Sequence, residues 1–182
     1  MSEYILSCDC ATHIFGWSII NTEDYSLIDY GEISNYKDDV LERIYFMTDT
    51  IQEIIKRYKD NLKYMIVEDV PRSSKNIETT VVLSKLNGAI LFLGHKYDLK
   101  TKLIYPTQWQ GALQFKRGVD TKQQSIEWVN NKYNTNFLYV SKHSKKNQDN
   151  VADSIAMACV VLGNYSRMAR YGRKSRLDGV SL

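Results

Sequence analysis

The sequence lacks the features that mark several classes of protein. Its three cysteines, Cys8, Cys10 and Cys159, are an odd number without the spacing of a disulfide framework or a zinc site. No stretch approaches the ~20 apolar residues of a membrane span. The N-terminus, MSEYILSCDC, has no basic region followed by a long apolar run, as a signal peptide would have. We therefore expect a reduced, cytoplasmic protein with no membrane partner.

Proline and glycine are also scarce, which leaves little material for linkers. The 182 residues include two prolines and nine glycines, and no repeat or low-complexity segment is present. A hydrophobic share of 43% is enough for a single core. We assign residues 1–164 to one domain and residues 165–182 to a basic C-terminal tail.

Charge is divided unevenly along the chain. Residues 1–109 carry 12 basic and 16 acidic side chains, whereas residues 110–182 carry 12 basic and 5 acidic ones, so the two parts have net charges of −4 and +7. A basic region of this kind favours a polyanionic partner, because clustered Lys and Arg release counterions when they meet phosphates. Charge alone leaves an ordinary solvated surface equally open.

The apolar pattern predicts a mixed α/β fold. An antiparallel start is followed by strand–helix–strand crossovers, which give parallel strands and helices on both faces of a five-stranded sheet. The expected strands are Tyr4–Asp9, Gly16–Ile20, Tyr25–Ile33, Lys63–Glu68 and Lys102–Tyr105. The first expected helix begins after Asp38 or Asp39 and ends near Asp60 and Asn61. The other expected helices cover Ile77–Lys96, Thr107–Leu113, Thr121–Tyr133 and the segment from Asp149 or Asn150 to Leu162.

Two acidic residues end apolar strands. Asp9 closes YILSCD and Glu68 closes YMIVE, where an isolated charge is costly to bury. Asp69 follows Glu68, but neighbouring strand residues face opposite ways, so only one of them can share a face with Asp9. Sites in open α/β sheets gather beyond the carboxyl ends of the strands. We favour Glu68, because Asp69 starts the turn before Pro71.

A further acidic motif, DNVADSIAMA, opens the last expected helix. At ~100° per residue, Asp149 lies within ~40° of Asp153 on the helical wheel, whereas Asn150 lies nearer the polar side. An N-cap at Asp149 with an exposed Asp153 is the alternative. Three or four converging carboxylates suit Mg²⁺ or Mn²⁺. Two such ions ~3.5–4 Å apart can clamp a scissile phosphate and activate water.

These segments together resemble a known family. LSCDCATHIFGWSII, MIVED and DNVADSIAMA, in this order and at these intervals, resemble the RuvC-type Holliday junction resolvases, especially the compact bacteriophage forms. The segment KQQSIEWV, residues 122–129, is similar to a lysine-led helix of that family. The resemblance covers roughly residues 4–163. It implies an RNase H-like fold, a homodimer, two Mg²⁺ ions per site (with Mn²⁺ as a substitute) and nicking of four-way DNA junctions or other branched DNA.

The resemblance also implies roles for the acidic residues. Asp9 would bridge both ions, Glu68 would be the second ligand, and Asp153 would be the ligand from the last helix. The family usually places its other helix ligand three residues before this aspartate, where this chain has Asn150. Asp149, four residues before, is the expected substitute.

Basic residues are the expected contacts to DNA. Lys122 fits one lysine position of the family and would contact the scissile phosphate, whereas Gln110 falls where another lysine is usual. Phe115 is a candidate to stack on an unpaired base, and the segment Ile77–Lys96 is the expected dimer surface. The other candidates for phosphate contacts are Lys116, Arg117, Lys142, Lys145, Lys146, Arg167, Arg170 and Arg173.

Other functions stay open at this stage. An RNA or single-strand nuclease of the same fold would use the same carboxylates, and a non-catalytic junction-binding protein would use the same basic surface. An actin-like kinase is disfavoured, because the turn after Asp9 reads CATHIF and has no glycine-rich phosphate loop.

Overall fold

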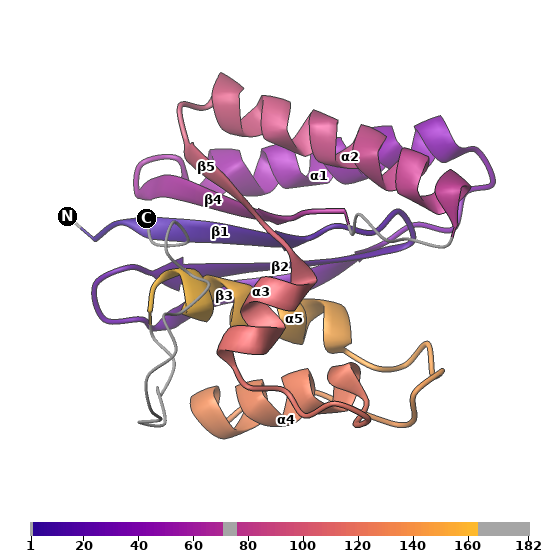
Figure 1. The fold of residues 1–182 in the computed structure, drawn as a ribbon. Coiled ribbons are helices and arrows are strands. Elements are labelled where there is room, and N and C mark those ends of the chain that lie inside the picture. The colour runs from indigo at the N-terminus through magenta and orange to yellow at the C-terminus, as the bar shows by residue number, and fades with distance from the viewer. Residues whose placement is uncertain (1, 71–75, 164–182) are drawn as a thin grey trace.

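The computed structural model describes residues 2–70 and 76–163. A five-stranded mixed sheet has the order β3-β2-β1-β4-β5 (Figure 1). The first two pairings, β1 with β2 and β2 with β3, are antiparallel, and β4 is parallel to both β1 and β5. The predicted antiparallel start and parallel continuation are therefore confirmed. The strands are β1 (Tyr4–Asp9), β2 (Ile14–Asn21), β3 (Leu27–Ser34), β4 (Leu62–Glu68) and β5 (Lys100–Ile104).

Helices cover both faces of this sheet, as predicted. The helices α1 (Val40–Tyr58) and α2 (Ile77–Lys96) lie above it in Figure 1. Below it lie α3 (Pro106–Ala112), α4 (Thr121–Tyr133) and α5 (Asp149–Val161). Of these, α5 packs directly on β1 and β2, whereas α4 packs against α5. The central strands therefore hold α5, and α4 packs on the outer side of α5.

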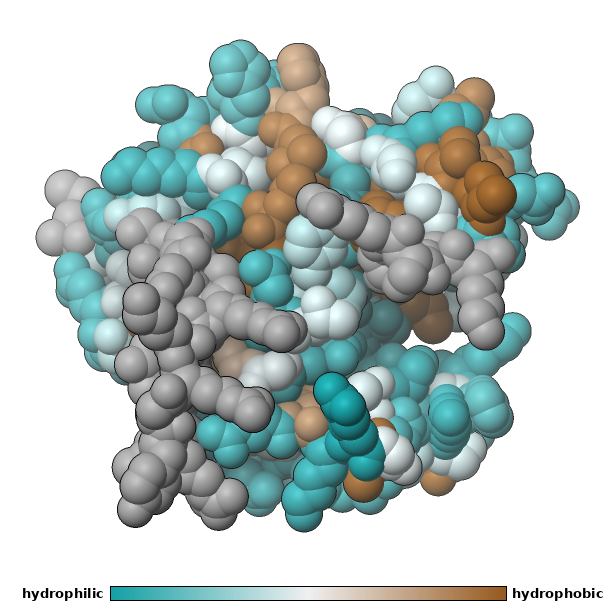
Figure 2. Space-filling model, viewed as in Figure 1, coloured by the Kyte–Doolittle hydropathy of each residue, from teal (hydrophilic) through white to brown (hydrophobic). Residues whose placement is uncertain are grey.

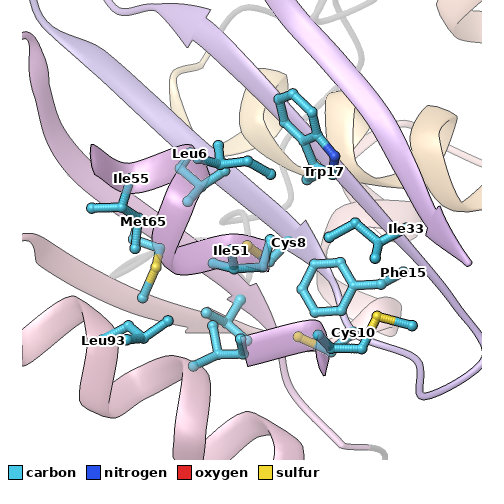
Figure 3. Packing of buried hydrophobic residues seen from close by; sticks show 14 of the residues in the cluster. Leu6, Cys8, Cys10, Phe15, Trp17, Ile33, Ile51, Ile55, Met65 and Leu93 are labelled. Carbon is cyan, nitrogen blue, oxygen red and sulfur yellow. The ribbon is translucent and has the colours of Figure 1, made fainter. Parts of the chain in front are cut away.

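The alternation of side chains along β1 divides the core in two. Leu6 and Cys8 face α1 and α2, whereas Ile5 faces α5. Cys8 and Cys10 lie among apolar side chains such as Phe15 (Figure 3). Both thiols are buried and free, and burial raises the pKa of the Cys8 thiol. These cysteines are core residues, on the face of β1 opposite to Asp9.

The outer face of α2 exposes apolar residues beside polar ones, and nothing in the described chain covers them. Ile77 is 76% exposed and Phe92 62%, whereas Leu86 and Ile90 on the opposite side of the helix are fully buried. In Figure 2, hydrophobic side chains lie over the N-terminal end of α2. By length and composition α2 could cross a membrane, which the sequence pattern did not indicate. Val81 is also exposed, because it belongs to this outer face.

Candidate active site

Asp9 and Glu68 lie side by side where two parallel strands end. Cys8 pairs with Val67 in the register of β1 and β4, so the next residue of each strand comes to the same edge. The Asn87 side chain of α2 donates a hydrogen bond to the Glu68 carbonyl oxygen (2.8 Å), which fastens this strand end to the helix. Asp69 instead accepts a hydrogen bond from the Val70 amide. The structure thus brings Glu68, and not Asp69, to Asp9.

The start of α5 carries Asp149 and Asp153 to the same edge. Gln148 is the N-cap residue and Asp149, which is buried, is the first residue of the helix, so the alternative of an N-cap at Asp149 with an exposed Asp153 is wrong. The helix start lies directly on Gly16 of β2, where an added Cβ would overlap the Asn150 carbonyl and lie 2.7 Å from the amide nitrogen of Val151. Gly16 pairs with Asp9 across the sheet. This close approach places the acidic helix beside the acidic strand end.

Crowding and burial disfavour ionisation of the strand-end carboxyl groups. Burial, and then the charges of Glu68 and Asp153, raise the pKa of Asp9 well above its usual range. Burial also raises the pKa of Glu68, while hydrogen bonds with Trp109 and Asp9 oppose this rise. The two carboxyl groups are thus poised to share a proton unless a cation compensates their charge.

Asp153 of α5 is the fourth acidic residue of this edge. Burial raises its pKa well above the usual range, which the nearby Ser125 hydroxyl and the charge of Lys122 partly offset. Within the described ranges, neither its Oδ1 atom nor the Ser125 hydroxyl closes a hydrogen bond of regular geometry. A buried carboxylate oxygen without a partner is costly, so this atom is suited to a ligand.

Lys122 forms an ion pair with Asp149. Its Nζ lies 2.6 Å from Asp149 Oδ2, and Asp120 holds the first turn of α4 by accepting a hydrogen bond from the Lys122 amide. Partial burial would lower the pKa of the Lys122 amine, but the hydrogen bond and charge of Asp149 outweigh that effect and raise it. Asp149, the predicted fourth ligand, is therefore paired with Lys122, the predicted phosphate contact.

Two residues near the site were not expected from the sequence. Glu32 of β3 pairs with Gly16, and burial followed by the charge of Asp149 raises its pKa. Trp109 of α3 is fully buried, and its indole N–H donates a hydrogen bond to Glu68 Oε1 (2.9 Å). In the sequence, Glu32 is only an acidic residue in an early strand and Trp109 only a tryptophan in a polar segment. Neither feature is enough to predict a place at the site.

The predicted basic residues lie on surface segments next to this site. Lys142, Lys145 and Lys146 are exposed in the loop before α5. Asn147 fastens that loop by accepting a hydrogen bond from the Val140 amide and donating one to the Ser141 carbonyl.

The segment between α3 and α4 brings two more basic residues to the surface. Lys116 and Arg117 are exposed there. Phe115, the candidate to stack on an unpaired base, is half-buried and packs edge-on against Trp109. Arg167, Arg170 and Arg173 lie outside the described residues, as does the whole predicted tail.

The chain as a whole has counterparts among known proteins. The family model of the crossover junction endodeoxyribonuclease RuvC matches residues 5–161. The chain belongs to the RuvC family. This match confirms the predicted Holliday junction resolvase family and its endodeoxyribonuclease class.

Individual RuvC proteins resemble the chain over nearly its full length. The crossover junction endodeoxyribonuclease RuvC of Rickettsia conorii is 26% identical over 166 residues, which cover 88% of this chain and 99% of that relative. The corresponding protein of Rickettsia typhi is 23% identical over 163 residues, which cover 85% and 93% of the two chains.

Two solved structures have the same fold. The Thermus thermophilus RuvC, solved in complex with a Holliday junction substrate, superposes with a TM-score of 0.69 at 15% identity and covers 91% of this chain and 96% of that one. The yeast mitochondrial Holliday junction resolvase Ydc2 has a TM-score of 0.57 at 14% identity, with 86% and 76% covered. The RNase H-like α/β fold is therefore confirmed.

Proposed function

We propose that the chain nicks Holliday junctions and other branched DNA by metal-dependent hydrolysis of phosphodiester bonds. The observation that carries this proposal is the meeting of Asp9, Glu68, Asp149 and Asp153 at one edge of a RuvC-family sheet. The three buried thiols are free, which suits action in the reducing cytoplasm.

Mg²⁺ is the cation that we propose for this edge, as two ions per site, with Mn²⁺ as a substitute. The donors are carboxylate oxygens, which hard divalent cations prefer, and the buried Oδ1 of Asp153 would gain a partner. Within residues 2–70 and 76–163, no three acidic, His or Cys side chains already form a ready ligand set. We therefore expect the carboxylates of α5 to move toward Asp9 and Glu68 when a cation binds. Two bound ions would activate water and neutralise the leaving oxygen.

The protein side chains would orient the DNA around this cluster. Asp149 can join the ligands only when Lys122 leaves it, and Lys122 is then free to bind the scissile phosphate. Asn150 is a weaker candidate for the fourth ligand, because its backbone is packed against Gly16 and its side chain is a neutral amide and not a carboxylate. The remaining predicted contacts to the DNA backbone are Lys116, Arg117, Lys142, Lys145 and Lys146, with Arg167, Arg170 and Arg173 in the tail.

We also propose that two copies pair through the outer face of α2. Ile77, Val81 and Phe92 form an exposed apolar row on this helix, and Gly88 lies in the same row with no atom within 4 Å of an added Cβ. A glycine inside a helix is destabilising, and within the described residues no neighbouring atom requires a glycine at this position. It would allow a second helix to approach closely.

Cleavage of a synthetic four-way junction tests the activity. In Mg²⁺ we expect cuts in the junction and little cutting of duplex DNA, single-stranded DNA or folded RNA, with no cutting in EDTA. Asp153→Asn should lower the rate at least ~100-fold while binding is kept, because a metal ligand contributes several kcal/mol to the transition state. Asp60→Asn, at an exposed turn, is the matched control.

Each other outcome would contradict part of the proposal. Preferred cutting of folded RNA would indicate an RNA nuclease of the same fold. Junction binding without cutting by the wild-type protein would indicate a non-catalytic binding protein. Unchanged cutting by Asp153→Asn would remove Asp153 from the proposed metal site.

The dimer is tested by its mass in solution. We expect Phe92→Glu to convert a dimer into a monomer in light scattering, because a charge would replace a 62%-exposed ring in the apolar row. Phe46→Glu, on the exposed side of α1, is the control and should stay dimeric. A monomeric wild-type protein, or equal dissociation by both variants, would overturn the assignment of this surface.

A further inference from the structure

Trp109 occupies an unusual position for a core tryptophan. Its side chain is fully buried, yet its single polar atom points to an acidic residue at the edge of the sheet, with 2.9 Å between the indole Nε1 and Glu68 Oε1. Phe115 packs edge-on against the indole ring at a centroid distance of 5.7 Å. The indole ring that carries the donor is therefore held by packing.

The surrounding backbone places this donor beside Glu68 with little freedom. Glu68 pairs with Ile104 at the end of β5, and α3 begins two residues later at Pro106. The backbone of Tyr105 and the side chain of Gln108 close a capping box at this helix start. Trp109 follows within the first turn, so the strand end and the indole belong to one rigid connection.

Glu68 is consequently held at two points. Asn87 binds its carbonyl oxygen and Trp109 binds one oxygen of its carboxylate. The same carboxylate lies close to that of Asp9. A long flexible side chain that is fixed in this way loses its other rotamers before any ligand arrives.

We propose that Trp109 is a positioning residue, which holds Glu68 toward Asp9 so that the pair is preorganised for a divalent cation. This inference rests on the proposed metal-dependent function. The indole N–H is a donor only, so it can hold a carboxylate but cannot itself bind the cation. Hydrogen-bond partners of metal ligands generally fix the orientation of those ligands, and Trp109 would fix the orientation of Glu68 in the same way.

Trp109→Phe tests the proposal because it keeps an aromatic ring in the core and removes the N–H donor. We expect Mg²⁺ affinity in calorimetry to fall by about 10-fold or more, as for other outer-shell partners, with cutting partly restored at higher Mg²⁺. Trp128→Phe, on the half-buried side of α4, is the matched control and should bind Mg²⁺ like the wild-type protein. Wild-type affinity in Trp109→Phe would overturn the proposal.

A second measurement requires no change at position 109. The chain has three tryptophans, so its ¹⁵N-labelled form should give three indole N–H signals in NMR spectra, which Trp17→Phe and Trp128→Phe assign. Mg²⁺ should shift the Trp109 signal alone, and Glu68→Gln should shift it without metal. A Trp109 signal that Mg²⁺ does not move would overturn the positioning role.

The same titrations separate this inference from the proposed function. Mg²⁺ binding that Asp9→Asn abolishes but Trp109→Phe leaves intact would retain the metal site and reject the role of Trp109. If the wild-type protein shows no Asp9-dependent Mg²⁺ binding, the proposed metal site itself fails, and the inference fails with it.

Discussion

Replacing Asp9 by asparagine should abolish junction cleavage and, at the same time, stabilise the metal-free protein. Asp9 is the proposed bridging ligand, and loss of several kcal/mol of metal-assisted stabilisation corresponds to a rate decrease of ~1,000-fold or more. The protein gains stability because Asp9 is 7% exposed and lies near three other carboxylates. Asparagine keeps the shape and can still donate a hydrogen bond to Glu68. A gain of ~1–2 kcal/mol would raise Tm by about 3–6 °C.

The sign of the pH dependence follows from the raised pKa of Asp9, whose first cause is burial. Between its unfolded pKa of ~3.9 and the higher folded value, the folded protein keeps a proton that the unfolded chain has released. Wild-type stability in EDTA should therefore fall as pH rises through this range, and the advantage of Asp9→Asn should be larger at pH 8 than at pH 4. Thermal unfolding at both pH values measures this. A lower Tm for Asp9→Asn at pH 8, with Asp60→Asn unchanged, would contradict it.

Gly16→Ala should disrupt the site, although Gly16 contributes no side chain to it. The new methyl group would overlap the Asn150 carbonyl and crowd the Val151 amide, both of which are backbone atoms that cannot rotate away. The start of α5 must then move, and it carries Asp149 and Asp153. We expect a loss of ~3 kcal/mol of stability and a ~100-fold fall in cleavage rate, because shifts of ~1 Å have such effects on reacting groups.

Gly111→Ala is the control for this experiment. Gly111 lies in α3 with nothing within 4 Å of an added Cβ, so the substitution should be neutral or slightly stabilising. Tm and the cleavage rate of both variants would be measured together. If Gly16→Ala kept the wild-type Tm and rate, the close approach of α5 to β2 could not be what positions the acidic helix.

The sequence predicted the two acidic strand ends because each is a local event. A charged residue that closes an apolar strand, as Asp9 and Glu68 do, is conspicuous within five or six residues. Parallel pairing of β1 with β4 then brings the two together, and that pairing follows from the order of strands and helices. Helical spacing likewise placed Asp149 and Asp153 on one side of α5.

What the sequence could not indicate depends on contacts between distant segments. The bond from Trp109 to Glu68 joins residues 41 positions apart, and the Lys122–Asp149 pair forms only because α4 packs on α5. The contact of Phe115 with the buried ring of Trp109 is a further case, because the basic neighbours Lys116 and Arg117 gave no sign of it. The apolar residues of α2 have the pattern of a core helix, and only the structure shows that one row of them stays exposed.

The hydrogen bond from Asn87 to the Glu68 carbonyl gives α2 a mechanical role in the proposed dimer. Asn87 precedes Gly88, so the amide that fastens the end of β4 adjoins the point where a second helix would cross. A helix of 20 residues is a rod of ~30 Å, and in the dimer two such rods would be clamped together. The two paired helices would then set the distance between the two active sites, and so the distance between the two nicks. No flexible linker between the subunits would let that distance change. A junction whose arms do not fit that separation would have to bend, since the enzyme could not.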